Sequence, residues 1–284
     1  NTNLVSNFYQ NYQKELKSYN GYYLQGIDGS TLYLLNTDSI LDEFGTAGNK
    51  HSQVAMARCL FRYDLMNEFI TDAKIAPIVV SEHPLGFDSL EQVSKDVISI
   101  YDRNFASIEF IYEHQRLGLK YVMRAKLGFN NEVKDFVSSG KREAIYEIPI
   151  NSNALKKMRA RGIEPNCKTV KVRLIAIDLP SGEKEILMTN LMEQEGFACE
   201  DLDVIYDSRW SVETYIDRIK NKMKVEIPIY SDLYSSNELF EKLNSQKNIE
   251  DIELKLVNNN YSFNLPFEDP VILAAIIQAG GTVL

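Results

Sequence analysis

Residues 206–220 read Tyr206-Asp-Ser-Arg209-Trp-Ser-Val-Glu213-Thr-Tyr-Ile-Asp-Arg-Ile-Lys220, inside a helix predicted over Leu202–Val225. Its apolar residues recur at the spacing of one helix face, namely Ile205, Val212, Ile216, Ile219 and Met223. The residues Tyr206, Arg209, Glu213 and Lys220 share a second stripe, roughly opposite the apolar one, because steps of three, four and seven residues return to the same side of a helix.

The chemistry of this polar stripe allows two interpretations. A carboxylate such as Glu213 can hold a hard cation such as Mg²⁺, and Arg209 and Lys220 can hold phosphates next to that metal. The plainer alternative is a solvent-facing helix with ion pairs four residues apart, such as Arg209–Glu213. Spacing alone favours this alternative, so the acids elsewhere in the chain become decisive.

Two aspartates follow apolar strand-like segments. Asp28 comes after Tyr22–Ile27, and Asp102 ends the β-branched run Val97–Tyr101, which is typical of a buried central strand. Each has a structural alternative: Asp28-Gly29 is a common hairpin turn, and Asp102 could cap a following helix. If both converge with Glu213 at one edge of a sheet, they form a site for two divalent metals that needs no histidine or cysteine.

The order of predicted elements up to residue 126 is β-β-β-α-β-α-β. Alternating polarity predicts a strand over Val54–Leu65, and a short helix is expected over Ser89–Lys95. A helix over Phe105–Leu117 ends at Gly118. Further strands are expected at residues 31–35, 69–75 and 120–126. We therefore predict an α/β fold with a mixed sheet flanked by helices.

The segment from residue 127 to 203 differs from this pattern. It contains three strand-like pieces, at residues 144–150, 168–178 and 184–189, the last two joined by a hairpin around Pro180-Ser-Gly-Glu183. We interpret it as a β-rich insertion subdomain. The expected division is residues 1–126 and 204–226 for the core, 127–203 for the insertion, and 227–284 for a segment of unknown role. In that last segment, a stop at Pro228, a helix near Asn237–Leu243, a strand near Glu253–Val257 and a final apolar stretch are expected.

Bulk composition restricts the function only loosely. The net charge of −9 argues against binding to DNA, but Arg103–Leu174 carries 15 basic and 7 acidic residues, a net of +8. Three scattered cysteines make a disulfide framework or a zinc site unexpected. No apolar stretch reaches the ~20 residues that span a bilayer, and the final one, Val271–Leu284, has 14. We expect a cytoplasmic protein without a membrane partner.

The motifs together resemble a known family. Residues 206–220 match the signature Y-(2)-R-(3)-E-(6)-K of bacterial transposases of the insertion-sequence-four family, a DDE transposase group. Ile27-Asp28-Gly29-Ser30 is similar to the segment around the first catalytic aspartate of that family. Ile100-Tyr-Asp102-Arg-Asn-Phe105 is similar to the second, and Tyr121–Lys126 to the strand that follows it. The resemblance covers about residues 20 to 226.

This resemblance implies an RNase H-like fold and a DNA transposase activity. Asp28, Asp102 and Glu213 would be the catalytic residues and would hold Mg²⁺ or Mn²⁺ in a two-metal site. DNA, both transposon ends and target, would be the partner, bound by a homodimer on paired ends at the bacterial nucleoid. The residues expected to contact DNA are Tyr206, Arg209, Lys220, Arg103, Arg124, Lys126 and Trp210, with a basic cluster at Lys156, Lys157, Arg159 and Arg161.

Two departures from the family leave alternatives open. Only 27 residues precede Asp28, where family members carry a DNA-binding region, and the family's C-terminal helices are not recognisable after Glu226. One alternative is a transposase-derived DNA-binding remnant without transposition activity. The other is an RNase H-like nuclease that only hydrolyses DNA.

Overall fold

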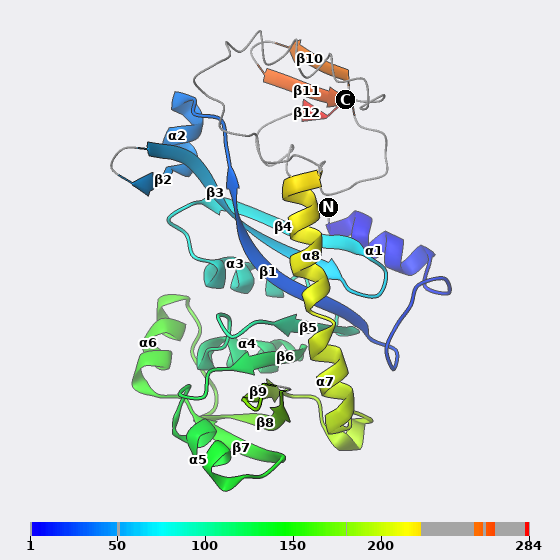
Figure 1. The fold of residues 1–284 in the computed structure, drawn as a ribbon, viewed down its shortest axis with the longest axis vertical. Helices are drawn as coiled ribbons and strands as arrows, with labels where there is room; N and C mark the ends of the chain where they lie inside the picture. The colour runs from blue at the N-terminus through cyan, green and yellow to red at the C-terminus, as the bar shows by residue number, and fades with distance from the viewer. Residues whose placement is uncertain are drawn as a thin grey trace.

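The computed structural model describes residues 2–49, 52–179, 181–222, 253–257, 260–264 and 282–283. Its main feature is a nine-stranded mixed sheet in the order β2-β3-β1-β5-β6-β9-β8-β7, with β4 also paired to β3 (Figure 1). The strands are β1 (Tyr23–Tyr33), β2 (Thr46–Asn49), β3 (Ser52–Asp64), β4 (Phe69–Pro77), β5 (Val97–Tyr101), β6 (Lys120–Ala125), β7 (Glu143–Pro149), β8 (Thr169–Asp178) and β9 (Lys184–Thr189).

The first five long strands have the arrangement expected of an RNase H-like core. Strands β1, β3 and β4 pair antiparallel, whereas β5 pairs parallel to β1 and β6 parallel to β5. The parallel connection between β5 and β6 runs through helix α4 (Ile108–Leu117), which ends at Gly118 in the left-handed conformation, as predicted. The mixed α/β fold class is therefore confirmed.

One helix lies earlier in the chain than predicted. The structure forms α3 over Glu82–Leu90, not over Ser89–Lys95, where turns follow the helix. Ser81 occupies the extended N-cap position of α3, and Pro84 falls within the first turn, where its missing N–H has no helical partner to lose. The prediction was wrong because it gave this N-terminal Ser-x-x-Pro pattern no weight.

The segment 127–203 extends the same sheet. Its three predicted strands are present as β7, β8 and β9, and β9 pairs antiparallel with β6, so they form no sheet of their own. Two unpredicted helices also occur here, α5 (Asn131–Ser139) and α6 (Ser152–Ala160). Both begin with an asparagine cap: the side chains of Asn130 and Asn151 accept hydrogen bonds from backbone N–H groups three residues on.

Helices cover both faces of the sheet. Alternation along β5 sends Ser99 and Tyr101 toward one face and Ile98 and Ile100 toward the other. The first face packs against α3, α4, α5 and α6. The second packs against α7 (Cys199–Asp207) and α8 (Trp210–Asp217), which lie in front of the sheet in Figure 1. The face to which a side chain on β1 or β5 points therefore decides which of these helices it can contact.

The remaining described elements are α1 (Thr2–Asn11), α2 (Asp38–Phe44), the short helices η1 (Glu193–Glu195) and η2 (Arg218–Lys222), and a separate three-stranded sheet of β10 (Glu253–Val257), β11 (Asn260–Asn264) and β12 (Thr282–Val283). The strand expected at residues 253–257 is thus confirmed. Pro180, Pro228, the helix expected at 237–243 and most of the final apolar stretch lie outside the described residues. Within the described part of the chain, no helix has the length and apolar character needed to cross a membrane.

Candidate active site

Asp28 lies within a continuous strand. The structure runs β1 through Asp28 and Gly29 without a break, so the two strands predicted around a turn are one, and the hairpin alternative is wrong. Leu24 and Gly26 face α7 and α8, and a Cβ on Gly26 would lie 3.3 Å from Cβ of Val212 in α8. Because side chains alternate along a strand, Asp28 shares that face.

Asp102 lies beside Asp28 at the carboxyl end of β5. Ile27 pairs with Tyr101 as the last pair of the parallel β1–β5 ladder, so Asp28 and Asp102 each follow this pair by one residue. Neighbouring strands lie ~4.8 Å apart. The helix-cap alternative for Asp102 is wrong, because Ser107 caps α4; Asp102 Oδ1 instead accepts a hydrogen bond of 2.9 Å from the Asn104 N–H. The two aspartates therefore share one edge of the sheet.

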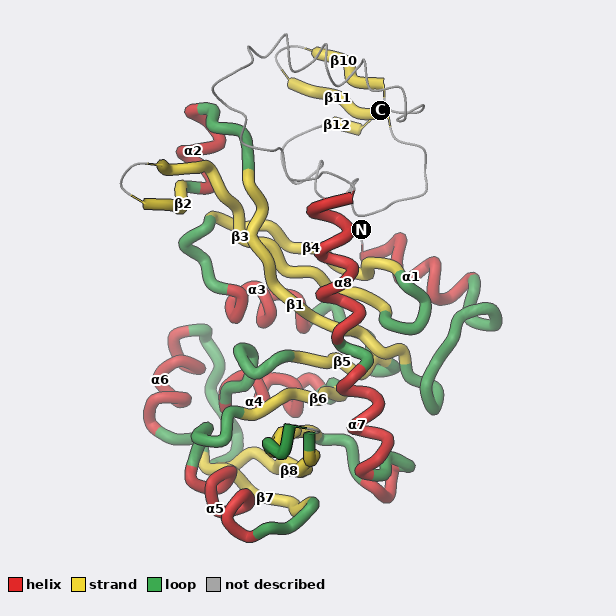
Figure 2. Tube along the Cα trace, viewed as in Figure 1, coloured by secondary structure: helices red, strands yellow, loops and turns green. Residues whose placement is uncertain are grey.

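Glu213 is carried by the second of two helices. The single helix predicted over Leu202–Val225 is interrupted at Ser208 and Arg209, and the described part continues beyond Asp217 as the π-helical η2 (Figure 2). Val212, Ile216 and Ile219 are buried against β1 and β3, as the apolar stripe predicts. That packing holds α8 across the Asp28 end of β1 and leaves the Glu213 side chain 35% exposed.

Electrostatics link the three acids. The pKa of Asp28 is raised from 3.8 to about 6, mainly by burial and to a smaller extent by the negative charges of Asp102 and Glu213. The Gly29 N–H, which donates to Asp28 Oδ1 at 2.9 Å, and the Arg209 cation both act to lower that pKa. Asp28 is thus within electrostatic reach of both Asp102 and Glu213.

Arg209 is buried beside these acids. It is 7% exposed, and its Nη2 lies 2.7 Å from Glu213 Oε1, while its Nε and Nη1 have no hydrogen-bond partner. Tyr206 is also buried, at 6%, and packs with the apolar cluster beneath α7. The expectation that Tyr206 and Arg209 lie opposite the apolar stripe is therefore wrong. Tyr206 lies four residues after Leu202 and Arg209 seven residues before Ile216, so helical spacing places both on the buried side. The alternative ion pair Arg209–Glu213 does form, but in a largely buried setting.

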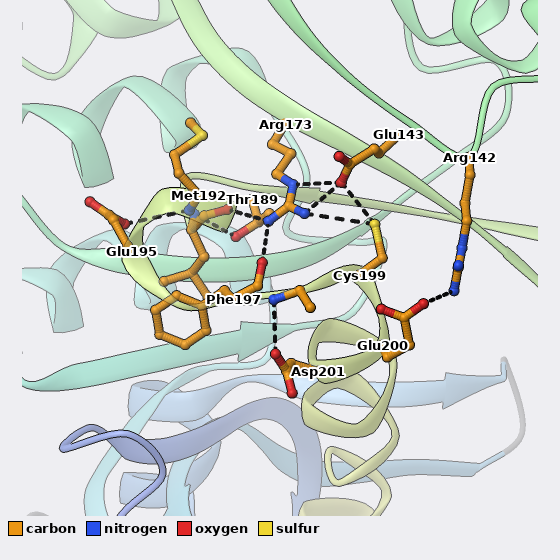
Figure 3. A network of polar contacts seen from close by, with 12 residues as sticks. Arg142, Glu143, Arg173, Thr189, Met192, Glu195, Phe197, Cys199, Glu200 and Asp201 are labelled. Atoms are coloured by element: carbon orange, nitrogen blue, oxygen red, sulfur yellow. Dashed lines mark hydrogen bonds and ion pairs between the residues drawn. The ribbon is translucent and has the colours of Figure 1, made fainter.

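A polar network anchors the start of α7. Arg173 in β8 is 3% exposed and donates to the Leu191 and Phe197 carbonyls at 3.1 and 2.7 Å, and it also pairs with Glu143 (Figure 3). The Cys199 thiol donates to Glu143 Oε2 at 2.8 Å, and burial with this bond raises the pKa of the thiol to about 11. These contacts fix the first turn of α7 to the sheet, and α7 leads directly into α8.

The other residues expected to contact DNA are dispersed. Arg124 follows Met123, the register partner of Tyr101, so it lies on the strand next to Asp102, and it pairs with Glu185 at 2.9 Å. Trp210 is 64% exposed on α8, Arg103 and Lys126 are exposed, and Lys220 is half-buried in η2.

The basic cluster lies on α6, on the opposite face of the sheet from α8. Lys157 pairs with Glu109, and the Arg161 guanidinium stacks over Phe87. Arg159 pairs with Glu164. Lys157 and Arg161 are thus directed at the α3 and α4 layer, and Arg159 at the exposed Glu164, so none of these three contacts is with Asp28, Asp102 or Glu213.

Two acids near the site were missed by the sequence. Glu185 is 7% exposed and lies within electrostatic reach of Arg124 and Arg209. Glu82, at the start of α3, contacts the backbone of Gly29: a Cβ on Gly29 would lie 2.1 Å from Glu82 Cδ. The only sequence signal for Glu82 was the glycine at position 29. A glycine inside a strand often marks a place where another group approaches the backbone closely.

The donor set suits a hard divalent cation, although the ligands are not yet assembled. Asp28 and Asp102 supply carboxylate oxygens, and their mutual repulsion is what such an ion relieves. Glu213 is held by Arg209, and among the described residues no three His, Cys, Asp or Glu side chains are close enough together to hold a metal ion. The residues fit Mg²⁺ or Mn²⁺ in their chemistry, and the ion pair with Arg209 engages Oε1 of Glu213.

Comparison with known proteins decides the family. The family model described as "Transposase DDE domain" matches residues 19–227. The chain belongs to the transposase DDE domain family. Its nine-stranded mixed sheet with flanking helices agrees with the RNase H-like fold expected of a transposase of this kind. This transposase domain matches none of the curated proteins.

One solved structure with partial similarity is Ciona intestinalis endonuclease V in complex with a 23-mer DNA containing an inosine followed by a ribo-adenosine. It is 12% identical, and the alignment covers 65% of the transposase chain and 80% of the endonuclease chain, with a TM-score of 0.26. That degree of similarity does not extend to function.

Proposed function

We propose that this chain is a divalent-metal-dependent DNA transposase that cuts DNA at the ends of an insertion sequence and joins the freed 3′-OH end to target DNA. The observation that carries the proposal is that Asp28 on β1 lies within electrostatic reach of two further acids: Asp102, which directly follows the neighbouring parallel strand β5, and Glu213 on α8. Membership of the transposase DDE domain family supports a nucleic-acid-processing enzyme, and the match of residues 206–220 to the Y-R-E-K signature supports the insertion-sequence-four family.

In this proposal Asp28, Asp102 and Glu213 hold Mg²⁺ or Mn²⁺. When bound, the ions neutralise the carboxylates and supply Lewis acidity at the phosphodiester. The protein's own contribution is to present three oxygen donors from a rigid sheet edge and one helix. The burial of Asp28 raises its pKa to about 6, so at pH 7 to 8 it is ionised and available as a ligand.

Cationic groups around the acids would orient the DNA. Arg209 carries two buried nitrogens without partners, and a phosphate oxygen is an acceptor that would satisfy them. Arg124 lies on the strand beside Asp102 and could hold a second phosphate on leaving Glu185. Trp210, exposed on α8, offers a flat surface for a base. We propose that Lys220, Arg103 and Lys126 add backbone contacts, and that two copies act on paired ends of DNA in the cytoplasm.

Strand transfer distinguishes this proposal from a nuclease that only hydrolyses. Labelled duplexes from the DNA flanking the gene, with free 3′-OH ends, are incubated with a plasmid and Mn²⁺. Covalent transfer of the label to the plasmid is expected, and it should disappear in Asp102→Asn. Nicking of the plasmid without transfer of label from any duplex would support the hydrolytic nuclease, and DNA binding without either reaction would support the binding remnant.

A further inference from the structure

Glu82 approaches the acidic site from the other face of the sheet. Gly29 follows Asp28 in β1, so a side chain at this position would point to the opposite face, toward α3. The Glu82 carboxyl group occupies the space where that side chain would lie: a Cβ on Gly29 would be 2.1 Å from Cδ and 2.5 Å from Oε1 of Glu82. The carboxyl group therefore rests on the strand backbone one residue from Asp28, in space that only glycine leaves open.

Glu82 also lies close to Asp102. Burial raises the pKa of Glu82, and the negative charge of Asp102 raises it further, so the two carboxylates sense each other. Glu82 and Asn104, from the loop that begins at Asp102, line the same pocket of about 320 Å³. Strand β5 ends at Tyr101, so no strand separates Glu82 from the space beyond Asp102.

One cation holds Glu82 in the metal-free state. Arg58 Nη1 lies 3.3 Å from Glu82 Oε1, and Arg58 Nε donates to the Val80 carbonyl at 3.3 Å. Both side chains of the Arg58–Glu82 pair are 25% exposed, so water reaches them and the pair can separate. Glu213 is held in the same way by Arg209 on the opposite face. A half-buried acid with one long contact to a cation, within electrostatic reach of the Asp102 carboxylate, is poorly compensated without an additional positive charge.

Arg209 gives an independent sign that a ligand belongs here. It is more than nine-tenths buried, its charge acts on Asp28, and two of its guanidinium nitrogens have no partner. Buried donors of this kind are ordinarily satisfied, so Arg209 can receive a group with acceptor oxygens beside Asp28 and Glu213. A phosphate bound together with a divalent ion supplies both the missing acceptor and the missing positive charge.

We propose that Glu82 is a fourth acidic residue of the centre formed by Asp28, Asp102 and Glu213, and that it leaves Arg58 to bind the divalent cation. This inference rests on the proposed function, because it assumes that Asp28 and Asp102 hold such an ion. It adds a ligand from α3, so the ion would be held from both faces of the sheet. It also gives Gly29 a specific purpose, which is to leave room for the Glu82 carboxylate.

The test is Mn²⁺ binding measured by isothermal titration calorimetry on the whole chain without DNA. Glu82→Gln should weaken Mn²⁺ binding about tenfold or more, within the 10–100-fold range seen when groups that support a metal are removed. Glu132→Gln is the matched control, because Glu132 is also a partly buried acid in the first turn of a helix, α5, and it should bind as wild type does. Glu82→Asp, which keeps the charge but shortens the reach, should fall between the two.

Gly29→Ala tests the geometry without touching a carboxylate. It should weaken Mn²⁺ binding in the wild-type background, because the new methyl group displaces the Glu82 carboxyl group, and it should have no further effect in Glu82→Ala. If wild type binds Mn²⁺ in an Asp28-dependent way and both Glu82→Gln and Glu82→Asp bind equally well, the role of Glu82 is refuted and the proposed function stands. If wild type binds no Mn²⁺ at all, the proposed function fails and the Glu82 inference with it.

Discussion

Replacing Asp28 by asparagine should stabilise the metal-free protein at neutral pH. Asp28 is largely buried next to Asp102 and Glu213, and its pKa is raised from 3.8 to about 6. The folded protein therefore binds this proton more tightly than the unfolded chain does. Stability accordingly falls as pH rises from about 4 to about 6, and the full penalty is present above that range. Asparagine removes the charge and can still accept the Gly29 N–H bond.

The size of the effect follows from the pKa difference. A shift of about two units corresponds to about 3 kcal/mol of unfolding free energy at pH 7 to 8 and to almost nothing below pH 4. For a domain of this length, that is a rise in melting temperature of about 6–10 °C. Small losses from placing an amide among carboxylates make this an upper value.

The assay is thermal unfolding followed by circular dichroism in EDTA at pH 4, 6 and 8. Asp28→Asn should melt above wild type at pH 8 and together with it at pH 4. Asp135→Asn, an exposed acid on α5, is the control and should change little at any pH. A variant that is destabilised at pH 8, or stabilised equally at pH 4 and pH 8, would refute the reasoning that repulsion and burial strain this acid.

Three further predictions follow from the same geometry. Millimolar Mn²⁺ should raise the melting temperature of wild type, because an ion that binds only the folded state stabilises it, and Asp102→Asn should lose most of that rise in the same melting assay. Arg209→Met should reduce the dependence of DNA affinity on salt, measured by fluorescence anisotropy, by a slope of about 1; an unchanged slope would remove Arg209 from the phosphate contacts. Arg173→Met should lower the unfolding free energy in urea by about 2–4 kcal/mol, since it leaves the Leu191 and Phe197 carbonyls without their Arg173 donor and Glu143 without its cation; a loss under 1 kcal/mol would mean that this network does not anchor α7.

The sequence was most informative where a local pattern and the fold agree. The apolar run Val97–Tyr101 became β5 with the same bounds, and the glycine stop of α4 was found at Gly118. The stripe of Val212, Ile216 and Ile219 was buried as predicted because packing against β1 and β3 needs one continuous apolar face. That the three acids share one metal site stays a prediction, because the structure establishes only the electrostatic reach of Asp28 to Asp102 and to Glu213.

What the sequence could not give depends on contacts between distant segments. The break before Trp210 leaves no periodic signal, because both helices keep the same apolar spacing. The burial of Arg209, by contrast, follows from its place seven residues before Ile216 on the apolar stripe. The pairing of β9 with β6 depends on long-range register, so the segment 127–203 could not be recognised as part of the core sheet. Glu82 meets Gly29 across 53 residues, and neither shows a periodic pattern that points to the other.

Metal-dependent nicking of DNA tests the central proposal most directly. Supercoiled plasmid is incubated with wild type and with Asp28→Asn, Asp102→Asn and Glu213→Gln, in Mn²⁺, Mg²⁺ or EDTA, with Asp135→Asn as the control. The account predicts nicked plasmid from wild type and the control only when Mn²⁺ or Mg²⁺ is present, and none from the three acid variants although each remains folded. Nicking that persists in EDTA, or that survives in Asp28→Asn or Asp102→Asn, would contradict it.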